Sequence, residues 1–171
     1  METKNFEIAA EQSNINWVGR KVTGAHNGTI AIKEGSLTLT DSKLSKGNFI
    51  IDTTSIKILD ITDPATNAQF GGHLASDDFF SSEKYPEAVF LITSLNGDRI
   101  NGDLTIKGIT NTVTFPAKIE VKDGIVKANG KLVIDRTQWG IRYRSGKFYD
   151  NLADQTVSDD IEIHMKIIAK K

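Results

Sequence analysis

The chain has 171 residues, no cysteine and a formal net charge of −1, with 39% hydrophobic and 25% charged residues. This length fits one hydrophobic core, so a single domain over residues 1–171 is expected. The charge balance excludes the basic excess of a nucleic-acid binder, the missing cysteines exclude disulfides and thiol chemistry, and the absence of a long apolar run excludes a membrane-spanning helix.

The first twelve residues are expected to form a peripheral N-terminal segment. They lack the charged-then-apolar layout of an export signal, so the chain is either cytoplasmic or, if a leader was removed, periplasmic or extracytoplasmic. From Asn14 onward, apolar and polar residues alternate with the period of β-strands. Strands are predicted around residues 15–17, 30–39 and 49–51, with Gly35 at a bulge or corner.

Residues 63–75 interrupt this alternation. Asp63 is a good N-cap, and Pro64 suits the first position of a helix. Gly71-Gly72 is expected to end the turn or helix that forms. The sequence therefore predicts one short helix in this connection.

Two hairpins are predicted in the second half of the chain, with tight turns at Asn96-Gly97 and Asp123-Gly124. The last strand, around residues 161–167, carries His164 on its polar face. About eight antiparallel strands favour an all-β fold, a single extended up-and-down barrel, because closure removes exposed strand edges. A strand such as 125–135 would span roughly 35 Å at about 3.3 Å per residue, long enough for an elongated apolar tunnel.

The sequence offers little support for catalysis or for a metal or cofactor site. His26, His73 and His164 lie far apart and have no metal-ligand spacing. His26 and His73 lie in glycine-bounded turns, where each either bonds to nearby backbone or borders a pocket mouth. The acidic pairs Asp77-Asp78 and Asp159-Asp160 are not expected to share a proton, because adjacent strand residues point to opposite faces.

Arg136 is the most informative polar residue. It follows Leu132 and Ile134 on the apolar face of a strand, and a buried guanidinium needs a partner. Either it clamps a corner of the fold through a carboxylate or backbone carbonyl, or it meets a ligand head group, and both roles are compatible. Trp139 is expected to pack beside it or to close one end of the barrel. The segment 142–149 mixes cations and aromatics and is interpreted as a rim beside the barrel.

Four blocks of the sequence resemble the YceI-like proteins, the polyisoprenoid-binding, lipocalin-like barrels of bacteria. The resemblance covers nearly the whole chain. Its blocks are Trp17 with Gly24-x-His26-x-Gly28, residues 73–80 with Tyr85-Pro86-x-Ala88-x-Phe90, residues 102–110, and Asp135-Arg136-x-x-Trp139-Gly140-Ile141. The family usually has Phe where this chain has Trp139, a larger ring that could shorten or reshape the tunnel.

The resemblance implies an extended barrel that holds a long isoprenoid, such as a prenyl quinone or prenyl phosphate, without catalysis. It also implies export and, often, a homodimer. A barrel isomerase or cyclase acting on a hydrophobic substrate and a filled-core interaction protein remain the alternatives. The expected ligand-binding residues are Trp17, His26, His73, Leu74, Phe79, Phe80, Phe90, Leu104, Ile106, Phe115, Leu132, Ile134, Arg136 and Trp139.

Overall fold

The computed structural model describes residues 2–21, 24–41, 43–76, 78–143, 145 and 157–171. Strands dominate this part of the chain, together with one α-helix and two short 3-10 helices. The elements are, in order, β1 (Thr3–Ile8), η1 (Ala10–Gln12), β2 (Asn14–Lys21), β3 (Gly24–Thr40), β4 (Lys43–Ile58), α1 (Pro64–Ala75), β5 (Glu87–Asn96), β6 (Arg99–Ile106), β7 (Ile109–Lys122), β8 (Ile125–Asp135), η2 (Arg136–Trp139) and β9 (Val157–Lys170).

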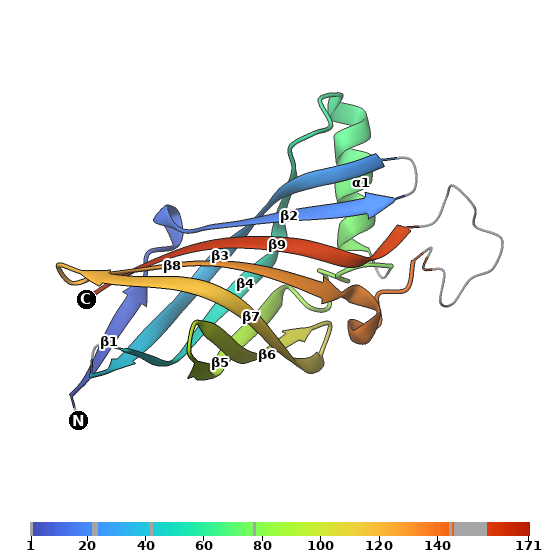
Figure 1. Cartoon of the computed structure of the whole chain (residues 1–171). Helices are drawn as coiled ribbons and strands as arrows, with labels where there is room; N and C mark the ends of the chain where they lie inside the picture. Colours follow the sequence, from blue (N-terminus) through green and yellow to red (C-terminus); the bar gives the residue numbers. More distant parts are fainter. Residues whose placement is uncertain (1, 22–23, 42, 77, 144, 146–156) are drawn as a thin grey trace.

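The strands form one antiparallel sheet that closes on itself (Figure 1). The order around the barrel is β3-β2-β9-β8-β7-β6-β5-β4, and pairing of β4 with β3 completes the ring. The predicted all-β fold, a lipocalin-like barrel of about eight antiparallel strands with one short helix, is confirmed. Both termini lie toward one end of the elongated barrel, and α1 lies at the other.

The N-terminal strand β1 shares one position of the barrel with β2, between β3 and β9. β1 pairs with residues 36–40 of β3 and 169–170 of β9. β2 pairs with the parts of the same two strands that lie toward the α1 end of the barrel. Between them, the Ser13 hydroxyl accepts a hydrogen bond of 3.0 Å from the Ile168 N–H. The prediction of a peripheral segment over residues 1–12 is therefore wrong. β3 and β9 extend beyond β2, and β1 covers edges that would otherwise stay unpaired while burying Phe6 and Ile8.

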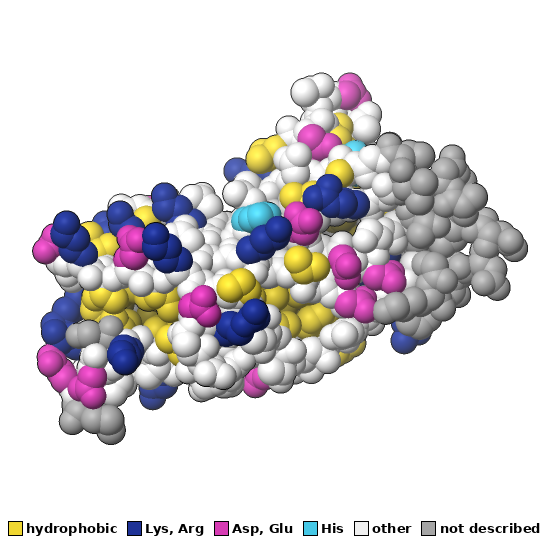
Figure 2. Space-filling view, viewed as in Figure 1, with side chains coloured by type: hydrophobic (Ala, Val, Ile, Leu, Met, Phe, Trp, Pro, Cys, Tyr) yellow, Lys and Arg dark blue, Asp and Glu magenta, His cyan; other side chains and the backbone are white. Residues whose placement is uncertain are grey.

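The alternation of residue types places every second side chain inside the barrel. On β6, for example, Ile100, Leu104 and Ile106 are buried among the core residues. The predicted hairpins at Asn96-Gly97 and Asp123-Gly124 are confirmed as the connections β5–β6 and β7–β8. The outer surface carries cationic and anionic side chains interspersed with apolar ones (Figure 2).

Helix α1 begins where the sequence predicts. The Asp63 carboxylate accepts hydrogen bonds from the Thr66 N–H at 2.9 Å and from the Thr66 hydroxyl at 2.6 Å. The predicted end at Gly71-Gly72 is wrong, because the helix continues to Ala75. Packing of Leu74, which is buried, outweighs the poor helix propensity of the two glycines. Within the described residues, no helix has the length and apolar character needed to span a bilayer.

Candidate functional site

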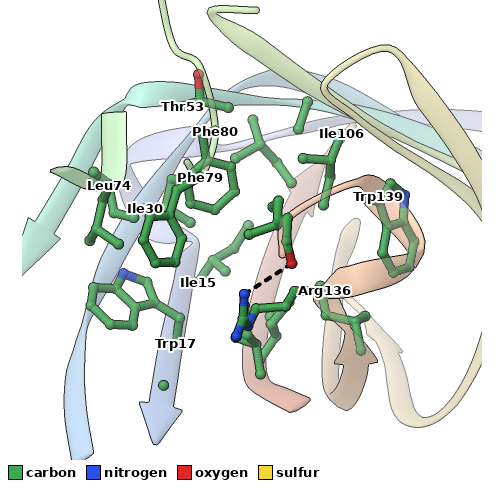
Figure 3. A pocket seen from close by; sticks show the side chains of 18 of the residues that line it. Ile15, Trp17, Ile30, Thr53, Leu74, Phe79, Phe80, Ile106, Arg136 and Trp139 are labelled. Atoms are coloured by element: carbon green, nitrogen blue, oxygen red, sulfur yellow. Dashed lines mark hydrogen bonds between the residues drawn. The ribbon is translucent and has the colours of Figure 1, made fainter. Parts of the chain in front are cut away.

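The end of the barrel next to α1 contains a cavity of about 340 Å³ (Figure 3). Side chains from β2, β3, β4, α1, β5, β6, β8, η2 and β9 line it, and most of them are apolar. Its volume lies within the range of roughly 300–1,000 Å³ that is typical of small-molecule sites. The cavity is therefore large enough for an organic ligand.

A bulge interrupts β4 at this end of the barrel. Thr29 of β3 pairs with Lys57, whereas Ala31 pairs with Asp52, so residues 53–56 leave the regular ladder. The Ser55 hydroxyl accepts a hydrogen bond of 2.8 Å from the Ala31 N–H and keeps the two strands together. Residues before the bulge and within it, such as Ile51, Thr53 and Ile56, line the cavity.

The structure brings thirteen of the fourteen predicted site residues to this one cavity. Phe115 is the exception. It lines a second cavity of about 20 Å³ farther toward the termini. The alternation pattern correctly places Phe115 inside the barrel, but it says nothing about how deep along the barrel axis the side chain lies.

Several cavity residues were not predicted from the sequence. Three of them, Ile161, Ile163 and Met165, share the apolar face of the last strand and could have been included on that pattern. Thr53 lies in the β4 bulge and Phe70 on α1, and both line the cavity. No periodic pattern in the sequence indicated the inward placement of these two.

Trp17 forms one wall of the cavity and packs over Gly28. The indole N–H donates to the Thr29 carbonyl oxygen at 3.2 Å. A methyl group on Gly28 would lie 2.6 Å from Cζ2 of Trp17 and would overlap the Lys57 carbonyl oxygen. The glycine is therefore required for the close approach of β3, the Trp17 ring and β4.

Replacing Gly28 with Ala is expected to destabilise the protein by about 1–3 kcal/mol, the usual cost of overpacking a closely packed site. Gly19→Ala is the matched control, because a methyl group on Gly19 meets no atom within 4 Å. Thermal unfolding of both variants tests the comparison. Equal melting temperatures for the two variants would contradict the packing role assigned to Gly28.

Arg136 is a structural clamp at the cavity wall. Its side chain is 1% exposed and donates four hydrogen bonds to backbone carbonyls. The acceptors are Ile141 at 2.9 Å and Tyr143 at 2.7 Å on one side, and Val157 at 3.0 Å and Ser158 at 2.9 Å at the start of β9. The guanidinium thus ties the segment after η2 to β9, as the clamp interpretation predicts.

Two carboxylates compensate part of the cost of burying this charge. Burial lowers the pKa of Arg136, while the charges of Asp159 and Asp135 raise it in part. One guanidinium nitrogen lies 4.0 Å from the nearer Asp159 oxygen. Asp135 also accepts a hydrogen bond of 3.0 Å from the Thr137 N–H and so begins the η2 turn. The sequence block around Arg136 therefore builds a rigid corner.

Trp139 completes that corner. It is 1% exposed, and its indole N–H donates to the Leu104 carbonyl oxygen at 2.9 Å. In Figure 3, Trp139 and Trp17 lie on opposite sides of the cavity. These are the two tryptophans of the chain, so its intrinsic fluorescence comes from the walls of the cavity.

His26 connects the β2–β3 hairpin to the region around α1. Its Nδ1 lies 2.8 Å from a carboxylate oxygen of Asp60, and its ring lies 4.8 Å from the ring of Phe70. Burial raises the pKa of Asp60, but hydrogen bonds from Asn27 and His26 and the charge of His26 outweigh this and leave the pKa below its usual value. His26 therefore satisfies a local partner and also borders the cavity.

His73 occupies a comparable place on α1. Its Nε2 lies 3.1 Å from Asp78, and its ring makes edge contacts with Phe79 and Tyr143 at centroid distances of 5.1 and 4.4 Å. His164 is instead on the outer face, near Glu162. Among the described residues, no three His, Cys, Asp or Glu side chains lie close enough together to hold a metal ion, and this includes the surroundings of both cavity histidines.

Two sequence interpretations lie outside the described residues, in whole or in part. Asp77 is not described, so the Asp77-Asp78 pair is not placed. The segment 142–149 is described only at residues 142, 143 and 145. Of these, Tyr143 lines the cavity.

Comparisons with known proteins agree with this geometry. A family model described as "YceI-like domain" matches residues 6–169. Protein YceI of Escherichia coli O17:K52:H18 is 36% identical over 98 residues, which cover 54% of this chain and 48% of that protein. The chain thus aligns with about half the length of the curated relatives it matches.

Two solved structures share the fold over almost the whole chain. BcnA of Burkholderia cenocepacia has a TM-score of 0.71 at 21% identity, covering 95% of this chain and 99% of BcnA. A polyisoprenoid binding domain from Saccharophagus degradans, implicated in plant cell wall breakdown, has a TM-score of 0.70 at 11% identity and covers 96% and 97% of the two chains.

Proposed function

Because the chain belongs to the YceI-like domain family, we propose that it binds a polyisoprenoid lipid, such as a prenyl quinone or prenyl phosphate, in the barrel cavity without catalysis. The apolar cavity of about 340 Å³ carries this proposal. The description of the similarly folded Saccharophagus degradans domain as polyisoprenoid-binding supports it. In this role the protein sequesters or carries the lipid.

The physical basis is the transfer of apolar surface out of water. Burial is favourable by roughly 25 cal/mol per Å² of apolar area, so an isoprenoid tail needs no specific polar contact to bind. The aromatic and aliphatic cavity walls supply the complementary surface. Head-group discrimination would then depend on few side chains at the mouth.

The isomerase or cyclase alternative has weaker support. The Arg136 guanidinium and the Thr53 hydroxyl donate to backbone carbonyls, and the two cavity histidines contact carboxylates. These polar groups thus have structural partners within the fold. The cavity also weighs against a protein whose core is entirely filled.

Mass spectrometry of an organic extract of the purified protein is the direct test. We expect a co-purified prenyl compound in amounts stoichiometric with the protein. Extraction of the same protein after delipidation controls for carry-over from the host membranes. A clean extract together with no binding of added prenyl lipids would contradict the proposal.

Removing the lipid is expected to lower thermal stability. A ligand present at about 100 times its dissociation constant stabilises the folded state by roughly 2.7 kcal/mol, provided that it binds only that state. Delipidated protein should therefore melt at a lower temperature, and a prenyl quinone should restore the midpoint. A midpoint that is insensitive to prenyl lipids of every length would favour the filled-core alternative.

A further inference from the structure

Two phenylalanines separate the large cavity from the small one. Phe49 of β4 and Phe90 of β5 are paired across the strands, and their ring centroids are 5.2 Å apart. Both side chains are 3% exposed, and both line each of the two cavities, as Met165 of β9 also does. The rings therefore lie between the half of the barrel next to α1, which contains the large cavity, and the half nearer the termini.

The barrel beyond these rings leaves no room for an isoprene unit. The second cavity measures about 20 Å³, enough for about one water molecule and far below the roughly 150 Å³ of a cavity that holds benzene. Phe115 packs against Phe90 from this side at a centroid distance of 5.8 Å. Core side chains such as Leu37 and Ile100 surround the remaining space. A ligand that enters from the mouth thus meets packed side chains at this depth.

A glycine fixes the position of the Phe90 ring. A methyl group on Gly102 of β6 would lie 2.5 Å from Cζ and 2.6 Å from Cε1 of Phe90. The ring consequently rests against the bare backbone of the neighbouring strand β6. The missing side chain of Gly102 leaves the space that the Phe90 ring occupies at this depth.

We propose that Phe49 and Phe90 form the floor of the site and limit the lipid tail that it encloses to about three isoprene units. This inference rests on the proposed lipid-binding function. An apolar protein cavity of about 150 Å³ accommodates benzene, which has six carbons, so proportional scaling to 340 Å³ gives about fourteen carbons. The predicted elongated tunnel is thus replaced by a cavity that ends at this floor.

A series of linear prenyl alcohols with one, two, three, four and eight isoprene units tests the length limit. Binding is read from the fluorescence of Trp17 and Trp139, which both line the cavity. Each buried CH₂ raises affinity by about fourfold, so each added unit should strengthen binding at least about tenfold up to the third. Beyond the third unit, we expect affinity to change by less than about threefold for each added unit, because the further carbons stay outside the cavity and in water.

Phe90→Ala should open the floor beside Phe49, so that affinity continues to rise at least through the fourth unit. Phe6→Ala is the matched control, because Phe6 is equally buried at 3% exposure but lines neither cavity. It should keep the wild-type limit. If Phe90→Ala does not fold, Phe90→Leu lengthens the accepted tail to a smaller degree. Ala88→Ile, above the floor, should shorten it.

The outcomes separate the two proposals. Steady strengthening through the eighth unit in the wild type, or identical length profiles for Phe90→Ala and Phe6→Ala, would overturn the floor while leaving lipid binding intact. Failure of every prenyl alcohol, and of prenyl benzoquinones used as a second probe series, would overturn lipid binding itself. A limit near three units that moves only with Phe90 and Ala88 supports both.

Discussion

Replacing Arg136 with Met is expected to destabilise the ligand-free protein by about 3–5 kcal/mol, the range observed when one partner of a buried charged interaction is removed. Methionine preserves much of the side-chain volume but leaves the carbonyls of Ile141, Tyr143, Val157 and Ser158 without their donor. It also leaves Asp159 without the nearby guanidinium. Urea unfolding of delipidated protein measures the loss.

Arg136→Lys provides the control for charge. Lysine retains the positive charge but cannot reproduce the planar guanidinium that reaches four carbonyls. Arg136→Lys should therefore lower the free energy of unfolding substantially, but less than Arg136→Met does. Lipid titration then tests a head-group role for Arg136. Such a role would make Arg136→Met lose more affinity, relative to wild type, for prenyl phosphates than for neutral prenyl quinones. Unchanged stability in Arg136→Met would contradict the clamp described above.

Trp139→Ala is expected to cost about 3–5 kcal/mol, as is usual for truncating a buried aromatic side chain. The indole is 1% exposed, and its removal leaves both a void and the Leu104 carbonyl without its donor. Denaturant unfolding of the delipidated variant, compared with wild type, gives the value. The enlarged cavity should also accept bulkier ligands.

Trp139→Phe separates the ring from its hydrogen bond. Phenylalanine keeps an aromatic wall but loses the hydrogen bond to the Leu104 carbonyl, so a loss of about 0.5–1.5 kcal/mol is expected. If Trp139→Phe is as unstable as Trp139→Ala, the hydrogen bond rather than the packed ring dominates. Wild-type stability in both variants would contradict a structural role for Trp139.

Strand periodicity predicts which face of the sheet a residue occupies, and this explains why so much of the cavity wall could be named from the sequence. Leu132, Ile134 and Arg136 share one parity, and all three line the cavity. Depth is a different quantity. It depends on the stagger of neighbouring strands, which residue type does not reveal. For that reason the sequence groups Phe115 with residues of the large cavity, although its side chain lines the small one.

Other features depend on contacts that are remote in sequence. The β4 bulge is stabilised by Ser55 and Ala31, which belong to different strands. β1 is a strand because β3 and β9 offer it two edges, whereas its own residues alternate only over Phe6-Glu7-Ile8. Likewise, α1 continues past Gly71-Gly72 because Leu74 is buried. In each case tertiary packing outweighs local preference.

The insertion of β9 between β8 and the β1–β2 position has a consequence for how the chain folds. Before β9 is available, β2 to β8 can form only an open sheet whose apolar face is exposed to water. The closing pairs, such as Ile15 with Met165 and Ile8 with Ala169, join opposite ends of the chain. Such non-local pairing is slow, and a ribosome-bound chain cannot achieve it until β9 has emerged. The nascent open sheet is thus a stage at which chaperones would act, and the cavity is enclosed only after β9 has joined the sheet.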